Sequence, residues 1–89
     1  MKSIRTEQFN KLLAQLPAQV QEQAREGYRL FKENPHNPRL HFKRISPTRP
    51  LYSVRVGYSY RAIGRLEGDT IRWEWIGSHE DYNKLYPRM

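Results

Sequence analysis

Hydrophobic residues recur at helical spacing near the start of the chain. Four of them lie at i, i+3, i+4 and i+7: Phe9, Leu12, Leu13 and Leu16. This spacing predicts an amphipathic helix of roughly three turns, with Thr6 as its N-cap. Residues 1–5 are polar, and we expect them to be frayed.

A second helix is predicted from about Pro17 to Glu33. Four of its residues share one apolar face, with Leu30 beside them: Val20, Ala24, Tyr28 and Phe31. Proline ends the preceding helix and suits the first turn of the next one, where its missing N–H is not needed. The two helices therefore form a hairpin with a very short connection. Asn34 and Pro35 end the second helix.

From Leu40 onward the apolar period changes from 3.6 to 2, which indicates β-strands. Four strands are predicted, at residues 40–45, 51–56, 60–66 and 70–76. Turns at residues 57–59 and 68–69 contain glycine and join the last three strands as hairpins. Ser78 then caps a short final helix, with Asp81 three residues later as its capping-box partner.

The alternation of side chains across these turns predicts which residues share a face of the sheet. One face packs on the helices and carries these residues: Tyr52, Val54, Val56, Tyr60, Ala62, Gly64, Leu66, Ile71, Trp73 and Trp75. In this register Gly64 lies opposite Trp73, and Ala62 opposite Trp75. The other face carries these residues: Ser53, Arg55, Arg61, Ile63, Arg65, Arg72, Glu74 and Ile76.

These elements predict a single α+β domain over residues 1–89. Its N-terminal two-helix hairpin packs on a twisted four-stranded antiparallel sheet, and a short C-terminal helix follows. A chain of 89 residues with 37% hydrophobic residues is too short for two cores.

Positive charge is concentrated in the predicted sheet. The formal net charge is +7, and residues 39–65 contain seven basic residues and no acidic one. Nucleic acid is the commonest partner of a small basic domain, an acidic protein is another, and a basic surface also serves solubility. Arg55 and Arg61 are predicted to be cross-strand neighbours, where like charges destabilise a sheet unless something uses them. Two guanidinium groups together can clamp a phosphate; alternatively, both point into solvent or meet Glu74.

Several kinds of site are excluded or disfavoured by composition. There is no cysteine, so disulfides and cysteine zinc sites are excluded, and three histidines do not suggest a metal cage. We expect no cofactor and no metal. The chain has no apolar run long enough to span a membrane and no signal-peptide core, which predicts an intact cytoplasmic protein without membrane association.

The sequence resembles the RelE/ParE superfamily of toxins from bacterial type II toxin–antitoxin systems. The segment LYSVRVGYSYRAIG is similar to the family's strand pattern, WIGSHEDYNKL to its last strand and H-x-x-Y segment, and FKENPHNPRLHFKRI to its helix end and first strand. The resemblance covers about residues 9–86. It implies a microbial ribonuclease fold and an antitoxin partner that covers the basic face.

The resemblance also implies site residues. Arg61 matches the strand arginine that nuclease members place against the scissile phosphate, and Arg55 matches an upstream basic position. His79 lies where members have an acid or phosphate ligand, and Tyr82 matches a C-terminal tyrosine. Ser53 departs from the pattern, because some relatives have lysine there.

We therefore expect Arg55, Arg61, His79 and Tyr82 to be catalytic. Arginines stabilise phosphorane charge, and histidine suits acid–base chemistry near neutrality. His79 could instead be a surface or capping residue, and Tyr82 could pack in the core. Three further residues are expected to contact RNA: Lys43, Arg44 and Arg65.

The leading hypothesis is a metal-independent, ribosome-dependent mRNA endonuclease that inhibits translation. Its expected partners are a cognate antitoxin, mRNA and the ribosome. One alternative is a ParE-like inhibitor of DNA gyrase without nuclease activity, and another is an inactive toxin-fold protein that binds antitoxin.

Overall fold

A computed structural model describes residues 1–85 of the chain, in three helices, one 3₁₀ turn and five strands. The helices are α1 (Glu7–Ala14), α2 (Ala18–Glu33) and α3 (His79–Leu85), and the 3₁₀ turn is η1 (Pro38–Leu40). The strands are β1 (Lys2–Arg5), β2 (Lys43–Arg44), β3 (Leu51–Val56), β4 (Tyr60–Glu67) and β5 (Thr70–Ser78). No helix in this part of the chain is long and apolar enough to cross a membrane.

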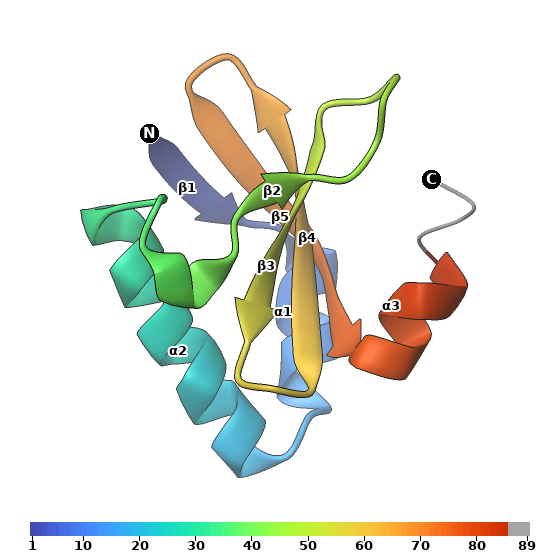
Figure 1. The fold of residues 1–89 in the computed structure, drawn as a ribbon. Helices are drawn as coiled ribbons and strands as arrows, with labels where there is room; N and C mark the ends of the chain where they lie inside the picture. Colours follow the sequence, from blue (N-terminus) through green and yellow to red (C-terminus); the bar gives the residue numbers. More distant parts are fainter. Residues whose placement is uncertain (86–89) are drawn as a thin grey trace.

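The strands form one mixed sheet in the order β1-β5-β4-β3-β2 (Figure 1). The α+β class is confirmed, but the prediction of four antiparallel strands was wrong. Strands β2 to β5 pair antiparallel, and β1 adds a fifth, parallel strand beside β5. Short turns join β3, β4 and β5, as the glycines at 57 and 68 predicted; both glycines have positive φ angles.

The N-terminal residues form β1, so the expectation that they are frayed was also wrong. The backbone of Ser3 accepts a hydrogen bond from the Tyr28 hydroxyl (2.9 Å), and its hydroxyl accepts one from Trp73 Nε1 (2.8 Å). Residues 2–5 do not alternate clearly between apolar and polar side chains, so the sequence alone did not indicate a strand. It is held by the free edge of β5 and by two aromatic side chains from elsewhere in the chain.

Replacing Ser3 with alanine is expected to lower the free energy of unfolding by about 1–3 kcal/mol, because a buried indole N–H loses its acceptor. Urea denaturation followed by circular dichroism measures the change. Ser59→Ala is the matched control, because Ser59 is exposed and its hydroxyl makes no hydrogen bond within residues 1–85. Equal stability of the two variants would show that the Ser3–Trp73 bond does not stabilise the fold.

Both predicted helices are present, and both pack on the same face of the sheet. The Thr6 side chain accepts a hydrogen bond from the Phe9 backbone (3.2 Å), which confirms the predicted N-cap. Helix α1 packs chiefly on β5 and α2 on β3, so the helices contact the sheet more than each other. Phe31 lies at the centre of this main core, with its ring edge-to-face against Trp73 at 5.2 Å.

The predicted first strand, residues 40–45, is mostly not a strand. The Asn37 side chain accepts a hydrogen bond from the Arg39 backbone (3.0 Å) and starts the turn η1. His41 then adopts the left-handed conformation (φ 48°, ψ 48°), and only Lys43 and Arg44 pair with β3. Leu40 is still buried, but from a turn rather than from a strand.

The register of β3 against β4 agrees with the prediction, and Arg55 lies directly opposite Arg61. The register of β4 against β5 agrees with the prediction only from the turn to Gly64. A bulge between Ile63 and Gly64 shifts the pairing, so Gly64 faces Trp73 as predicted, whereas Ile76 takes the place predicted for Trp75.

The consequence of the bulge is a second apolar cluster on the opposite face. Trp75 packs there instead of in the main core, together with these residues: Ile45, Leu51, Ile63, Tyr82 and Leu85. The face that was predicted to be basic is therefore divided. One part is apolar and packs against Tyr82 and Leu85 of α3, and the part next to the β3–β4 turn carries the arginine pair.

Candidate functional site

Arg55 and Arg61 are distinguished from other arginines on their face by having no acidic partner. Arg65 Nε lies 3.6 Å from a Glu74 carboxylate oxygen, and Arg72 Nε lies 3.3 Å from Glu67. Neither Arg55 nor Arg61 forms an ion pair within residues 1–85. The possibility that Glu74 neutralises the pair is thus wrong, because Glu74 pairs with Arg65.

The two guanidinium groups are close enough to repel each other. Arg61 is half-buried, and its pKa is lowered, first by burial and second by the positive charge of Arg55. The nearby Tyr82 hydroxyl acts in the opposite direction and raises the pKa of Arg61. Arg55 Nε is buried without a hydrogen-bond partner within the described residues. An anion bound between these side chains would relieve both costs.

His79 is positioned by the junction between β5 and α3. The Ser78 hydroxyl accepts a hydrogen bond from the Asp81 backbone (3.1 Å), which confirms the predicted cap. The His79 backbone N–H donates to the carbonyl of Ser59 (2.7 Å), so the start of α3 is tied to the β3–β4 turn. The imidazole itself is exposed and available to a ligand.

Tyr82 connects His79 to the arginine pair. Its ring lies nearly parallel to the imidazole, at 6.3 Å between centroids and 18° between planes. Tyr82 is only 7% exposed and belongs to the second apolar cluster, so its ring packs in a core. Its hydroxyl also influences Arg61, as described above. Tyr82 is therefore next to His79 and influences Arg61, which lies opposite Arg55 in the sheet.

The support beneath this site was not predicted from the sequence. Trp75 lies against Gly77, where a side-chain Cβ would come within 2.5 Å of the indole ring. Gly77 is the cross-strand partner of Arg61, so the indole covers the strand directly beside the arginine pair. The only signal in the sequence was the small residue at position 77, which alone does not reveal a bulge.

The three residues expected to contact RNA are more dispersed. Lys43 is exposed and pairs with Ser53, a buried neighbour of Arg55 on the same face. Arg44 pairs with Tyr52, and its Nε donates to the Ser46 carbonyl (2.9 Å), so it braces the β2–β3 loop. Arg65 is engaged with Glu74. Lys43 is thus the best placed of the three beside the arginine pair.

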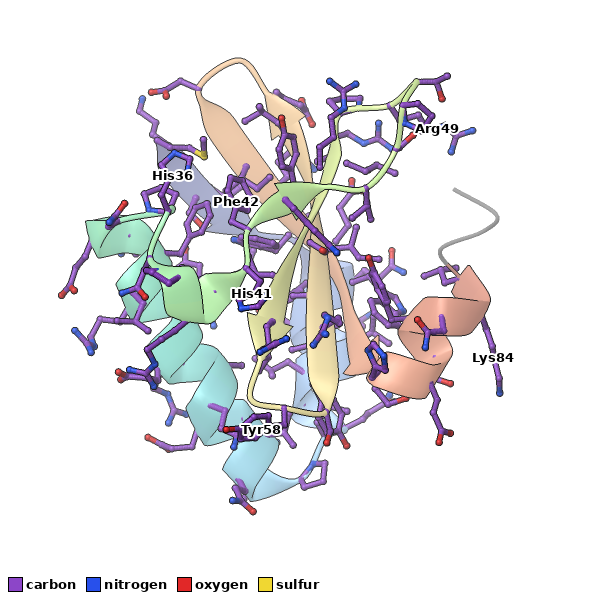
Figure 2. All side chains as sticks on the ribbon, viewed as in Figure 1. His36, His41, Phe42, Arg49, Tyr58 and Lys84 are labelled. Carbon is purple, nitrogen blue, oxygen red and sulfur yellow. The ribbon has the colours of Figure 1, made fainter. Side chains whose placement is uncertain are left out.

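Figure 2 shows where the other labelled polar residues lie. His41 and Tyr58 lie on the α2 side of the sheet, whereas Lys84 projects from α3 on the opposite side. Within residues 1–85, no three His, Asp or Glu side chains gather in a group that could hold a metal ion.

The comparison with protein families gives a direct match. A model of the ParE-like toxin domain matches residues 18–84, which contain α2, the β2–β5 sheet and almost all of α3. The chain belongs to the ParE-like toxin domain family. The superfamily resemblance inferred from the strand pattern and the His-Tyr ending is therefore confirmed. Among curated proteins, none matches the sequence.

Two solved structures share the fold of this ParE-like domain. One is the RelB–RelE antitoxin–toxin complex from Methanococcus jannaschii, with a TM-score of 0.75 and 21% identity over 94% of this chain and 99% of that chain. The other is a copper-bound mutant toxin from Helicobacter pylori, with a TM-score of 0.59 and 17% identity over 91% of this chain and 97% of that chain. At these identities the likeness establishes the fold.

Proposed function

We propose that this ParE-like toxin is an endoribonuclease that cleaves mRNA on the ribosome and so inhibits translation. The observation that carries the proposal is that Arg55 and Arg61 lie opposite each other and neither has an acidic partner within residues 1–85. The exposed His79 provides a titratable group at the start of α3, which is tied to the β3–β4 turn. Like charges directly opposite each other destabilise a sheet, and an anion bound between two guanidinium groups would offset that cost. A phosphodiester is the anion that a toxin of this type would meet on RNA.

In the proposed cleavage of the phosphodiester, the arginine pair, His79 and Tyr82 have separate roles. The 2′-hydroxyl oxygen attacks phosphorus and releases its proton to solvent water, and the bond from phosphorus to the 5′-oxygen breaks. Arg55 and Arg61 bind the non-bridging oxygens, where negative charge grows in the transition state. His79 protonates the departing 5′-oxygen. Tyr82, packed beneath the imidazole and next to Arg61, holds both groups in position. This mechanism needs no metal ion.

The decisive experiment is a reconstituted translation assay with primer extension on the translated mRNA. Site-specific breaks that appear only with the toxin and active ribosomes support the proposal. The same assay without ribosomes tests whether cleavage depends on them. Arrested growth with intact mRNA and damaged DNA would instead support a gyrase inhibitor, the alternative that the ParE-like family match favours.

Replacing His79 with glutamine is expected to reduce cleavage about 100-fold or more, which is the usual contribution of a general acid. Binding to RNA should change little, because the arginine pair is untouched. Single-turnover cleavage and RNA affinity, measured on the same preparation, separate these effects. His41→Gln is the matched control, because His41 is also exposed but lies at the end of η1. Full cleavage by the His79 variant would remove it from the mechanism.

We further propose that an antitoxin covers the basic face when the toxin is silent. A net charge of +7 and the antitoxin–toxin complex among the structural neighbours support this partner. Because the attraction is electrostatic, the complex should weaken as salt rises. Co-expression with a small acidic protein encoded next to the toxin, followed by co-purification, tests the proposal. If the toxin alone is harmless to cells, it is an inactive member that only binds antitoxin.

A further inference from the structure

A groove lies beside Arg55. It lies between α2, the turn η1 and the C-terminal end of β3. Strand β2 pairs only with Tyr52 and Ser53, so it does not cover this end of β3. Its volume is about 590 Å³, within the roughly 300–1,000 Å³ range of ligand-binding clefts. Gly27, Leu30 and Leu40 form its apolar lining, and Arg39 adds a second cation beside Arg55.

Arg55 belongs both to this groove and to the candidate catalytic cluster. It lines the groove and lies opposite Arg61 in the sheet. Its Nε is buried and has no hydrogen-bond partner within the described residues, and the guanidinium forms no ion pair there. A strand of RNA whose phosphate lies on Arg55 and Arg61 therefore has a neighbouring nucleotide within reach of the groove.

Tyr58 stands at the mouth of the groove. It is 92% exposed, at the tip of the β3–β4 hairpin next to α2 (Figure 2). No aromatic ring and no hydrogen bond from residues 1–85 engages its side chain. A single exposed aromatic residue is ordinary by itself. Here it lines the same groove as an unpaired arginine, which is the combination that single-stranded nucleic acid uses for base stacking.

Gln23 adds a polar group that can recognise a base. Its side chain lies against Gly57, where a Cβ would come within 2.5 Å of the Gln23 Oε1 atom. The amide is half-buried and makes no hydrogen bond within the described part of the chain. It therefore presents donors and an acceptor to the groove, as side-chain amides do toward base edges.

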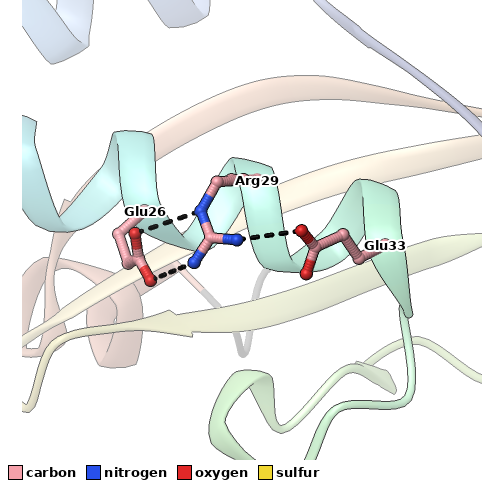
Figure 3. A network of polar contacts seen from close by, with 3 residues as sticks. All are labelled: Glu26, Arg29 and Glu33. Atoms are coloured by element: carbon pink, nitrogen blue, oxygen red, sulfur yellow. Dashed lines mark hydrogen bonds and ion pairs between the residues drawn. The ribbon is translucent and has the colours of Figure 1, made fainter.

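The acidic residues on the α2 wall do not oppose this use. Figure 3 shows Glu26 bound by two nitrogens of Arg29, whose third nitrogen reaches Glu33. Arg29 donates to the two Glu26 oxygens at 2.7 and 3.3 Å and lowers the pKa of Glu26. Glu22 is ion-paired with Arg25 through one guanidinium nitrogen. The wall is thus electrically compensated, and the phosphate backbone is favoured on the Arg55 side.

We propose that this groove holds an unpaired base of the RNA, next to the phosphate bound by Arg55 and Arg61. Tyr58 stacks on the base, and the Gln23 amide contacts its edge. The site sets which nucleotide neighbours the cleaved bond. This inference rests on the proposed function for its substrate, but it concerns base binding and is tested without cleavage.

The test measures binding of two fluorescent probes to the toxin in a His79→Gln background, which prevents cutting. One probe is a single-stranded oligoadenylate RNA of about eight nucleotides, within the usual site size. The other is the same length of backbone with abasic spacers. Tyr58→Ala should weaken oligoadenylate binding roughly 5- to 100-fold, the effect of losing one stacked base, and should not change binding of the abasic probe. Tyr58→Phe should bind like the parent.

The remaining variants distinguish loss of base stacking from loss of phosphate binding and from misfolding. Gln23→Ala should weaken oligoadenylate binding only, whereas Arg55→Ala should weaken both probes and lose its effect at high salt. Ile4→Ala is the control for removing an exposed apolar side chain, because Ile4 lies on β1 at 44% exposure and should bind both probes normally.

Unchanged oligoadenylate binding by Tyr58→Ala, or equal loss with both probes, would overturn the proposal. The first result would assign the groove to a protein partner instead. If only the proposed nuclease function is wrong, the wild-type protein will not cleave mRNA. Tyr58→Ala will still weaken binding of oligoadenylate without changing binding of the abasic probe.

Discussion

Arg61→Ala is expected to slow mRNA cleavage roughly 100- to 1,000-fold, the usual effect of removing one preorganised donor from a developing oxyanion. Arg61 is central to the cluster: it faces Arg55 across the sheet and lies close enough to the Tyr82 hydroxyl for this group to affect its pKa. Single-turnover cleavage in the reconstituted translation assay measures the loss.

The same substitution should leave the protein folded. Burial and the charge of Arg55 both lower the pKa of Arg61, so its charged form is disfavoured in the free protein. Removing it relieves the repulsion and offsets the lost side-chain contacts, and we expect stability to change by less than about 1 kcal/mol. Loss of activity without loss of stability is the signature of a functional residue.

Arg72→Ala is the matched control for this prediction. Arg72 lies on the same face of the sheet but is ion-paired with Glu67 at 3.3 Å, so its charge is already compensated. We expect near-normal cleavage from this variant. If Arg61→Ala and Arg72→Ala reduce activity equally, the general positive charge of the face matters, and the unpaired arginines have no special role.

Trp73→Ala is expected to be the most destabilising of the substitutions considered, at about 3–5 kcal/mol. Trp73 is 3% exposed, packs edge-to-face on Phe31, and donates its indole N–H to Ser3. A domain of this size has a total stability of only about 4–13 kcal/mol, so the variant should be largely unfolded or close to it. Urea denaturation followed by circular dichroism tests this.

Trp75→Ala should behave differently, although the two residues are only two positions apart. Trp75 is half-buried and belongs to the second cluster with Tyr82. Its removal therefore leaves the packing of the main core unchanged. We expect a smaller loss of stability and about a 10-fold loss of cleavage, since a 1 Å misplacement of catalytic groups has effects of this order or larger. Equal destabilisation by both variants would place the two indoles in one layer and contradict the bulge.

Much of the architecture follows from local chemistry that the sequence displays. The 3.6-residue period of Phe9 and its neighbours, the Thr6 cap and the proline between the helices led to α1 and α2. The glycines at 57 and 68 have the positive φ angles that their turns require, and they set the register that places Arg55 opposite Arg61. A role for His79 beside this pair was inferred from the family resemblance and stays a prediction; the structure places its ring against Tyr82.

Other features had no local signal. The bulge in β5 inserts one residue against β4, and every side chain beyond it changes face; whether Trp75 or Ile76 enters the main core depends on packing across three strands. Similarly, Glu74 was free on sequence grounds to neutralise any of several arginines. Its pairing with Arg65 leaves Arg55 and Arg61 without an acidic partner within residues 1–85, and only the fold decides this.

The sequence by itself therefore determined the helices, the two hairpins, the opposed arginines and the toxin family of this chain, because each is encoded by residues close together or by a register that turns control. The tertiary structure alone decided the fifth strand, the second apolar cluster beneath Tyr82, and the groove between Gln23 and Tyr58. Each of these joins residues distant in sequence through shape and free backbone edges, which no periodicity along the chain records.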